Sequence, residues 1–209
     1  MRHGGRDTPR GFLFELSGGD LALDFANTVD RRPTARPVEL LRSYGDLVSW
    51  ARQAGALDAR EARRLAREAS RRPRRAAAAL RRARSLREAL FRTFASAAAD
   101  RRAPKSAIDS LSPAIAQALG RLRLRPGRRR GARWAWAEDP NLGRMLWPVL
   151  RAAGALLTGQ ELERLRECAA GDCGWLFLDR SKNRSRRWCD MTVCGNRDKA
   201  RRHRARRRA

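Results

Sequence analysis

Hydrophobic residues recur at spacings of three and four along most of the chain, which is the pattern of helices with one buried face. The longest such stretch, residues 76–99, places a core-facing stripe of Leu80, Leu86, Leu90, Phe91 and Phe94 on one helix. We predict helices over residues 21–29, 43–55, 57–69, 76–99, 106–120 and 141–158. The larger part of the protein is therefore expected to be mostly helical.

Local signals mark where several of these helices begin and end. Asp20 can cap the first helix, and Asp58 with Glu61 makes a capping-box-like start for the third. The third helix is expected to end before Pro73, because proline disfavours helical backbone in the residue that precedes it. For the same reason residues 31–37, which contain two prolines, are predicted to form a loop.

Two stretches alternate with a period of two, which is typical of strands. After an N-terminal stretch that we expect to be mobile, residues 12–16 predict a short strand. Further on, Leu122 and Leu124 alternate with arginines, and Trp134 and Trp136 alternate with small residues, around a Pro-Gly turn; this pattern predicts a β-hairpin. Residues 1–160 are thus expected to form a mostly helical α+β domain with a few short strands.

The charge of the protein is strongly positive and unevenly distributed. The 209 residues include 48 lysines and arginines against 22 acidic residues, a formal net charge of +26. Residues 180–209 alone contain 13 basic and two acidic residues, and so carry +11 of that charge. Such a surface attracts polyanions, which makes nucleic acid the leading class of partner and an anionic membrane the second.

Membrane insertion is not expected. The N-terminal residues contain no apolar signal-peptide region, and no stretch approaches the roughly 18 uninterrupted apolar residues of a membrane span. We therefore expect a cytoplasmic, nucleoid-associated protein whose thiols stay reduced.

The four cysteines of the chain form two close pairs, Cys168 with Cys173 and Cys189 with Cys194. Two pairs separated by a folded spacer are typical of structural zinc sites, because Zn²⁺ prefers four soft ligands in a tetrahedron. Two disulfides would need an oxidising compartment, and a catalytic zinc ion would keep an open coordination position. We predict a structural zinc ion bound by all four cysteines.

The residues around the cysteines predict a small module over residues 161–209. Residues 175–179 can form a strand that pairs with residues 163–168, residues 180–188 a polar turn, and a last helix begins near Cys194. This order predicts a treble-clef-like zinc finger with a small core of Trp175, Phe177 and Trp188. So few apolar groups cannot hold the module together alone, so we expect metal binding and folding to be coupled.

The last helix is predicted to be polar nearly all round and self-repulsive, so that beyond about Arg202 it frays when no polyanion is bound. Arginine matches phosphates and guanine edges, and asparagine can pair with adenine. For each side chain the alternatives are a solvated charge or a non-specific phosphate contact, and Asn196 could instead close the metal loop. The candidate nucleic-acid contacts are Arg184, Arg186, Arg187, Asn196, Arg197, Lys199, Arg201, Arg202 and Arg204.

Asp24 and Asn27 are polar residues flanked by apolar ones in the first predicted helix. They could contact a ligand, or they could tie the helix to a neighbouring loop or strand; we favour the second role. The chain shows no Ser/His/Asp constellation, phosphate-binding loop or dinucleotide fingerprint, so we do not expect an enzyme.

Residues 173–208 resemble the CGNR zinc-finger family, and residues 18–30, GGDLALDFANTVD, resemble the start of the ABATE domain that precedes this finger in bacterial proteins. The resemblance implies a stress-induced transcription regulator with a DNA-binding finger, and it implies no particular effector.

We therefore expect a regulator that binds double-stranded DNA through its C-terminal helix, with residues 1–160 as a sensing or assembly domain. An RNA- or ribosome-associated zinc protein is the alternative, since arginine-rich segments also fold on RNA. No residue pattern identifies a small-molecule effector or a dimer face.

Overall fold

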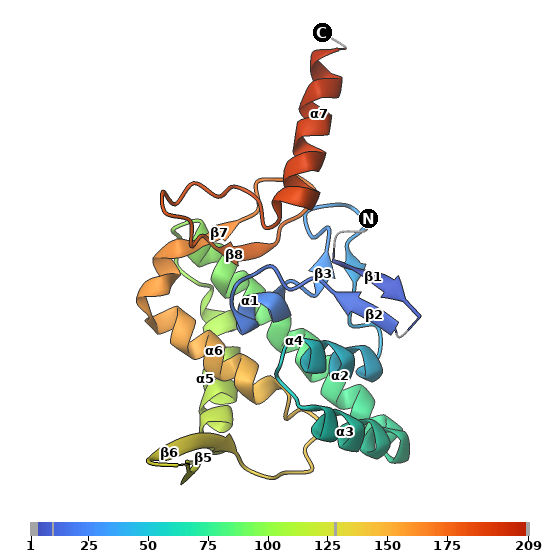
Figure 1. The fold of residues 1–209 in the computed structure, drawn as a ribbon, viewed down its shortest axis with the longest axis vertical. Helices are drawn as coiled ribbons and strands as arrows, with labels where there is room; N and C mark the ends of the chain where they lie inside the picture. The colour runs from blue at the N-terminus through green and yellow to red at the C-terminus, as the bar shows by residue number, and fades with distance from the viewer. Residues whose placement is uncertain (1–3, 10, 128, 208–209) are drawn as a thin grey trace.

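Helices make up most of the structure, which is a computed structural model describing residues 4–9, 11–127 and 129–207 (Figure 1). The long helix α4 runs through the middle, with α5 and α6 along one side and α2 and α3 along the other. Helix α7 projects from one end of the molecule. The helices are α1 (Leu21–Ala26), α2 (Tyr44–Gln53), α3 (Ala59–Arg71), α4 (Pro73–Ala98), α5 (Lys105–Leu119), α6 (Leu146–Thr158) and α7 (Asn196–Arg206).

Short strands pair two by two at the edges of this helical body, each pair antiparallel. A 3₁₀ segment, η1 (Gln160–Arg164), and a single π-helical turn, η2 (Met191–Gly195), flank the cysteine-containing region. The mostly helical α+β class predicted from the sequence is confirmed. The strands are β1 (Gly5–Thr8) with β2 (Gly11–Phe14), β3 (Val29–Asp30) with β4 (Val38–Glu39), β5 (Leu122–Pro126) with β6 (Ala132–Trp136), and β7 (Leu165–Glu167) with β8 (Leu176–Leu178).

The predicted helix starts are formed by hydrogen bonds at the caps. Asp58 accepts from the Glu61 amide while Glu61 accepts from the Asp58 amide, which is the predicted capping box. Helix α2 begins with a second such box, between Ser43 and Asp46. Helix α4 starts at Pro73, three residues earlier than predicted, because proline is tolerated at the first helical position.

The N-terminal segment differs from the prediction in two places. The stretch expected to be mobile contains β1, which pairs with β2 through a turn that Gly11 closes with a φ of 108°. Helix α1 ends at Ala26 instead of residue 29, because Asn27 leaves the helix and Val29–Asp30 pair with Val38–Glu39 across the 31–37 loop. Both differences depend on partners distant along the chain, which helical periodicity does not show.

One continuous core joins the helices to the cysteine-containing segment. Trp50, Phe25 and Phe94 fill its helical part, and Trp175 and Phe177 extend it towards the cysteines. The small separate core expected for the C-terminal module is therefore absent from the described residues, because two of its three aromatic side chains pack into the shared core.

A partly buried ion-pair network fastens the 31–37 loop and β4 to α4. The Arg87 guanidinium, 3% exposed, donates to both carboxylate oxygens of Glu39 at 2.6 and 2.7 Å. Arg32 pairs with Glu88 at 2.7 Å and stacks over the Phe91 ring at 3.8 Å, which leaves Phe91 half-buried at the edge of the core. This network positions the loop that joins β3 to β4.

Residues 18–29 dock directly onto the segment that carries the first cysteine pair. The Asn27 amide donates to the Leu176 carbonyl at 2.8 Å and accepts from the Leu176 amide at 2.9 Å, although the two residues are 149 positions apart. The Trp175 indole donates to the Val29 carbonyl at 3.0 Å, and the Leu178 amide donates to the Gly18 carbonyl at 2.9 Å. Strand β8 is thus completed by the N-terminal segment along the edge that β7 leaves open.

Asn27→Ala should destabilise the whole protein, because it leaves the buried amide and carbonyl of Leu176 without partners. We expect a loss of about 2–4 kcal/mol in the free energy of unfolding, measured by chemical denaturation. The matched control is Asn183→Ala at an exposed loop position, which should change stability by less than about 0.5 kcal/mol. Equal stability of the two variants would show that the Asn27 contact contributes nothing.

Candidate metal centre and nucleic-acid interface

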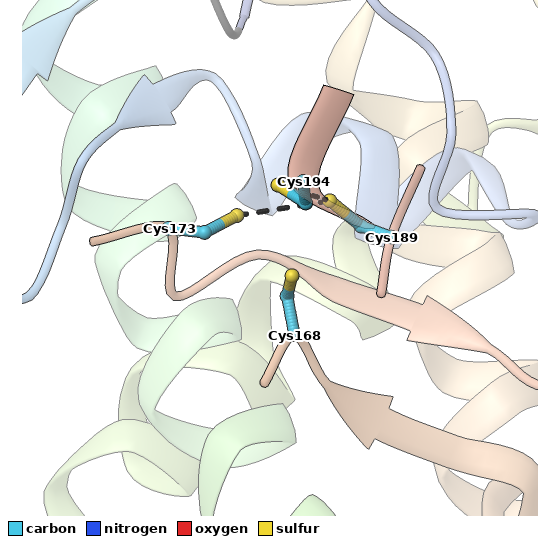
Figure 2. Close-up of side chains that lie close together, drawn as sticks. All are labelled: Cys168, Cys173, Cys189 and Cys194. Carbon is cyan, nitrogen blue, oxygen red and sulfur yellow. Dashed lines mark hydrogen bonds between the residues drawn. The ribbon is translucent and has the colours of Figure 1, made fainter. Parts of the chain in front are cut away.

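The two cysteine pairs converge at one buried point. Cys168 follows β7 and Cys173 precedes β8, while Cys189 ends the polar loop and Cys194 lies in the π-helical turn η2 (Figure 2). The four Sγ atoms lie within 4.8 Å of one another, and the side chains are buried, with Cys168 the most exposed at 6%. All four thiols therefore point towards a common centre, although they come from segments on both sides of the loop.

Two of the sulfur–sulfur distances match the edges of a tetrahedral metal site, and no pair of sulfur atoms is more than 4.8 Å apart. Sγ of Cys189 lies 3.7 Å from that of Cys173 and 3.6 Å from that of Cys194. A zinc–sulfur bond of about 2.3 Å gives sulfur–sulfur edges of about 3.8 Å in a tetrahedron, whereas a disulfide needs about 2.05 Å. The cysteines are free thiols, and their arrangement forms a zinc-finger-like metal site.

The electrostatics of the cluster favour a cation at its centre. Hydrogen bonding from Cys173 and then Cys189 lowers the pKa of Cys168 to about 7, while hydrogen bonding to Cys168 and burial raise the pKa of Cys173 well above its usual range. The pKa of Cys189 is raised too, first by its hydrogen bond with Cys168. Four thiolates this close repel one another, and a bound divalent cation removes that repulsion.

Backbone and side-chain contacts hold the cysteines in place. The Cys168 amide donates to the Trp175 carbonyl at 2.8 Å, and the Asp190 carboxylate caps η2 by accepting from the Val193 amide at 2.9 Å. The Arg197 guanidinium donates to Sγ of Cys194 at 3.5 Å and pairs with Asp172 at 3.0 Å. Such groups around the ligands orient them and balance the thiolate charge.

Asp179 organises the polar loop that follows β8, and the sequence patterns did not single it out. Its carboxylate is fully buried and accepts from the Ser181 hydroxyl at 2.6 Å, the Ser181 amide at 2.9 Å and the Arg186 amide at 2.9 Å. The hydrogen bond from the Ser181 hydroxyl, with the two amides, holds the pKa of Asp179 below its usual range. The sequence does contain a signal for this role of Asp179. It is an acidic residue that directly follows a buried strand and stands two residues before a serine.

The predicted nucleic-acid contacts on the loop have different surroundings. Arg186 stacks over the Phe177 ring at 4.5 Å and donates to the carbonyls of Trp188 and Cys189, so it holds the loop against the metal site. Arg187 lies 5.3 Å from the Trp188 ring, and Arg184 is exposed with a φ of 49° and a Glu163 oxygen 3.9 Å away. Of these three loop arginines, Arg186 is the one held most firmly by contacts within the protein.

On α7 the predicted contacts divide in the same way. Lys199 and Arg204 are exposed, and Arg201 is exposed but pairs with Asp198 at 2.7 Å. Asn196 donates to the Thr192 carbonyl at 3.0 Å, which joins η2 to α7, and Arg197 belongs to the metal site. The backbone of Arg202 is helical, and α7 continues to Arg206; fraying of the free helix beyond Arg202 stays a prediction.

Asp24 lies on α1 and holds the turn before it. Its carboxylate accepts from the Gly18 amide at 2.8 Å, and a Cβ atom at Gly18 would lie 3.0 Å from that oxygen. Burial raises the pKa of Asp24 to about 6, more than the hydrogen bond from Gly18 lowers it. Asp24 and Asn27 thus both bind backbone groups of the segments that α1 touches.

A cavity of about 660 Å³ lies between the N-terminal segment and the metal site. Its wall combines an apolar side with several charged side chains, and it reaches the Asp172–Arg197 pair beside Cys194. The lining residues are Asp7, Phe12, Asp30, Arg31, Val38, Glu39, Leu40, Arg42, Asp172 and Arg197. A molecule bound here would touch both the N-terminal domain and the contacts that support the metal site.

A helical domain that shares its core with a four-cysteine metal site defines a zinc-finger protein with a large N-terminal domain. Residues 19–160 match the ABATE family, described as "Putative stress-induced transcription regulator", and residues 164–207 match the CGNR zinc finger. The chain belongs to the ABATE family and carries a CGNR zinc finger at its C-terminal end. Neither description is that of an enzyme.

No curated protein matches the sequence. Among the described residues, no helix has the length and apolar character needed to cross a membrane.

Cys189→Ser should abolish stable metal binding, because Cys189 supplies one of the four sulfur atoms of the site and its Sγ lies within 3.7 Å of those of Cys173 and Cys194. We expect the bound metal per chain, measured by mass spectrometry of the intact protein, to fall to near zero and the free energy of unfolding to fall by more than about 3 kcal/mol. The control Val193→Thr keeps all four thiols and nearly the same volume beside Cys194, and should keep its metal. Full metal occupancy in Cys189→Ser would contradict a site that needs all four cysteines.

Asp24 should make stability fall as the pH rises. The carboxyl has a pKa of about 6 in the folded state, against roughly 3.9 in the unfolded state. Between these pH values the folded state binds more protons than the unfolded state, so the free energy of unfolding falls as the pH rises, and this fall levels off above about pH 6. Asp24→Asn stays neutral, so its stability relative to the unchanged protein should rise by about 2 kcal/mol between pH 4.5 and 7.5. Chemical denaturation across this pH range measures the difference, and a flat difference for Asp24→Asn would refute the assignment.

Proposed function

We propose that the protein is a DNA-binding transcription regulator in which a structural zinc ion fixes the base of the basic helix α7. The observation that carries this proposal is the position of α7: it starts directly after Cys194 and projects away from the body of the molecule (Figure 1). An exposed, positively charged helix of this kind is suited to the major groove, which admits an α-helix.

Zinc is the metal that fits the donor set best. Four thiolates at tetrahedral spacing select Zn²⁺ over the harder cations Mg²⁺ and Ca²⁺, which prefer oxygen ligands. The ligand residues would be Cys168, Cys173, Cys189 and Cys194. Because four protein ligands complete the coordination sphere, the ion would hold the fold and would leave no position for a substrate.

In this proposal the metal site fixes the direction of a helix that has no apolar face, so that the helix can contact DNA in a defined orientation. Helix α7 has little hydrophobic surface with which to pack, so its direction is set at its first turn, by η2 and by the Arg197 contacts to Cys194 and Asp172. Lys199, Arg201 and Arg204 then hold defined positions relative to the metal site. In this proposal Arg184, Arg187 and Arg202 add phosphate contacts, and Arg186 positions the loop.

Residues 1–160 would act as the sensing or assembly domain, and residues 161–209 as the DNA-binding unit. The cavity between the two supports a sensing role, because its wall includes the Asp172–Arg197 pair next to Cys194. A nucleoid-associated position in the cytoplasm follows from this function.

Lys199→Gln with Arg204→Gln should weaken binding to duplex DNA by about tenfold or more, and should lower the slope of log affinity against log salt by about 2, since each lost phosphate contact removes about 0.9. The matched control, Arg60→Gln with Arg63→Gln on the exposed side of α3, removes the same charge and should leave the slope within about 0.5 of the parent value. Affinity is measured by fluorescence anisotropy of a labelled duplex.

Equal slopes for the two variants would contradict α7 as the DNA contact. Stripping the metal should abolish binding by the unchanged protein. Tighter binding to structured RNA than to duplex DNA at the same salt concentration would favour the RNA-associated alternative over transcription regulation.

A further inference from the structure

The hairpin β5–β6 lies at the opposite end of the molecule from α7 (Figure 1). Its base is fixed to the body: Arg121 pairs with Asp139 at 3.0 Å, and Trp136 packs on Trp147 with ring centroids 6.0 Å apart. The Gly127 amide donates to the Gly131 carbonyl at 2.9 Å and closes the turn at the far end. The hairpin is therefore a projecting ribbon with an anchored base.

The register gives this ribbon two different faces. Leu124 lies opposite Trp134, and Arg125 lies opposite Arg133, and successive side chains of a strand point to opposite faces. One face is apolar, with Leu124 61% and Trp134 56% exposed. The other face carries arginine from both strands.

Within the described part of the chain, the arginines near the tip make no ion pair with an acidic residue. Among the residues that the structure describes, no ion pair involves Arg125, Arg129, Arg130 or Arg133, and all four are exposed. The direct Arg125–Arg133 pair places like charges across the strands, which destabilises a hairpin. The hairpin without a partner therefore has repulsion between its arginines and an exposed tryptophan. A bound polyanion would remove the repulsion.

We propose that the β5–β6 hairpin is a second DNA-contacting arm, separate from the metal site and α7. Its arginines would bind phosphates, and the Leu124–Trp134 face would lie against the sugar and base edges of a groove. A two-stranded ribbon fits a DNA groove, and apolar side chains on such arms insert at base steps. The choice of DNA as the polyanion rests on the proposed function, whereas the surface itself depends on neither zinc nor α7.

Charge complementarity favours DNA over a protein or a second copy of this chain on the apolar face. Four exposed guanidinium groups, none of them in an ion pair among the described residues, lie on the same hairpin as Trp134. A second copy, which carries the same net charge of +26, would bring further positive charge to them. Closely spaced phosphates supply the anions that these groups lack.

The test uses the full zinc-loaded protein and a quadruple variant, Arg125→Gln, Arg129→Gln, Arg130→Gln and Arg133→Gln. The matched control removes the same charge from the exposed side of α3: Arg60→Gln, Arg63→Gln, Arg67→Gln and Arg71→Gln. Removing the like-charge pair should not unfold the hairpin. Weaker binding by this variant would therefore reflect lost contacts between the arginines and DNA, not unfolding. Circular dichroism and metal content confirm that both variants are folded.

We expect the hairpin variant to lower the slope of log affinity against log salt by about 2–4 and to bind a 40-base-pair duplex at least tenfold more weakly than the α3 control. Trp134→Ala should weaken binding by about threefold to tenfold with the slope unchanged, since it removes an apolar contact. Identical slopes and affinities for the hairpin and α3 variants would overturn the proposal. So would a Trp134→Ala variant that alters the sedimentation mass of the protein but not its DNA affinity, because the apolar face would then join two copies.

The α7 variant Lys199→Gln with Arg204→Gln separates this inference from the proposed function. If the α7 variant binds like its control while the hairpin variant is impaired, α7 is not the DNA contact and the hairpin stands. If only the α7 variant is impaired, the proposed function stands and the hairpin arm is refuted.

Discussion

Two hydrogen bonds between Asn27 and Leu176 are the contact on which the arrangement of the molecule depends. A side-chain amide presents a donor and an acceptor side by side, so Asn27 pairs with the backbone of β8 as a neighbouring strand would. Trp175 reaches back to Val29 across the same boundary. Because these groups are buried, they must be paired, and the N-terminal segment and the cysteine-bearing strand are held in one position relative to each other.

This contact changes the physical picture of the metal site. A small zinc module usually depends on its ion for folding, whereas here the strand between the cysteine pairs is also packed into a core shared with α1 and α4. Because residues 180–187 and the described part of α7 contribute no side chain to that core, the metal would secure chiefly these two segments. Loss of the ion should therefore destabilise both the cysteine-bearing segment and the N-terminal segment, since these two segments are packed together.

The two basic surfaces differ in how they are held. Helix α7 has little apolar surface and takes its direction from the metal site, while the β5–β6 hairpin is anchored through Arg121 and the Trp136–Trp147 contact. Because the two surfaces lie at opposite ends of the molecule, a single duplex that contacted both would have to span its length (Figure 1). Two DNA segments bound one to each surface would be held together by the protein.

Local chemistry was predictable from the sequence, and long-range pairing was not. The box of Asp58 and Glu61 and the alternation around Trp134 depend on neighbours, so their helix start and hairpin follow from spacing alone. The common site of the four cysteines followed from thiol chemistry. The sequence predicts that Asn27 ties the first helix to a loop or strand, but periodicity does not reveal its partner Leu176. The same holds for the partners of strand β3 and of the buried Asp179. The sequence predicts Arg186 and Arg197 as nucleic-acid contacts, and only the fold shows that they support the metal site.

The central claim is that the N-terminal segment and the metal-bearing segment form one cooperative unit. Hydrogen exchange of the full chain, followed by mass spectrometry of peptides before and after metal removal, tests this claim most directly. The account predicts faster exchange in residues 165–207 and also in residues 18–30, which contain no metal ligand. Faster exchange confined to residues 165–207, with residues 18–30 unchanged, would contradict it.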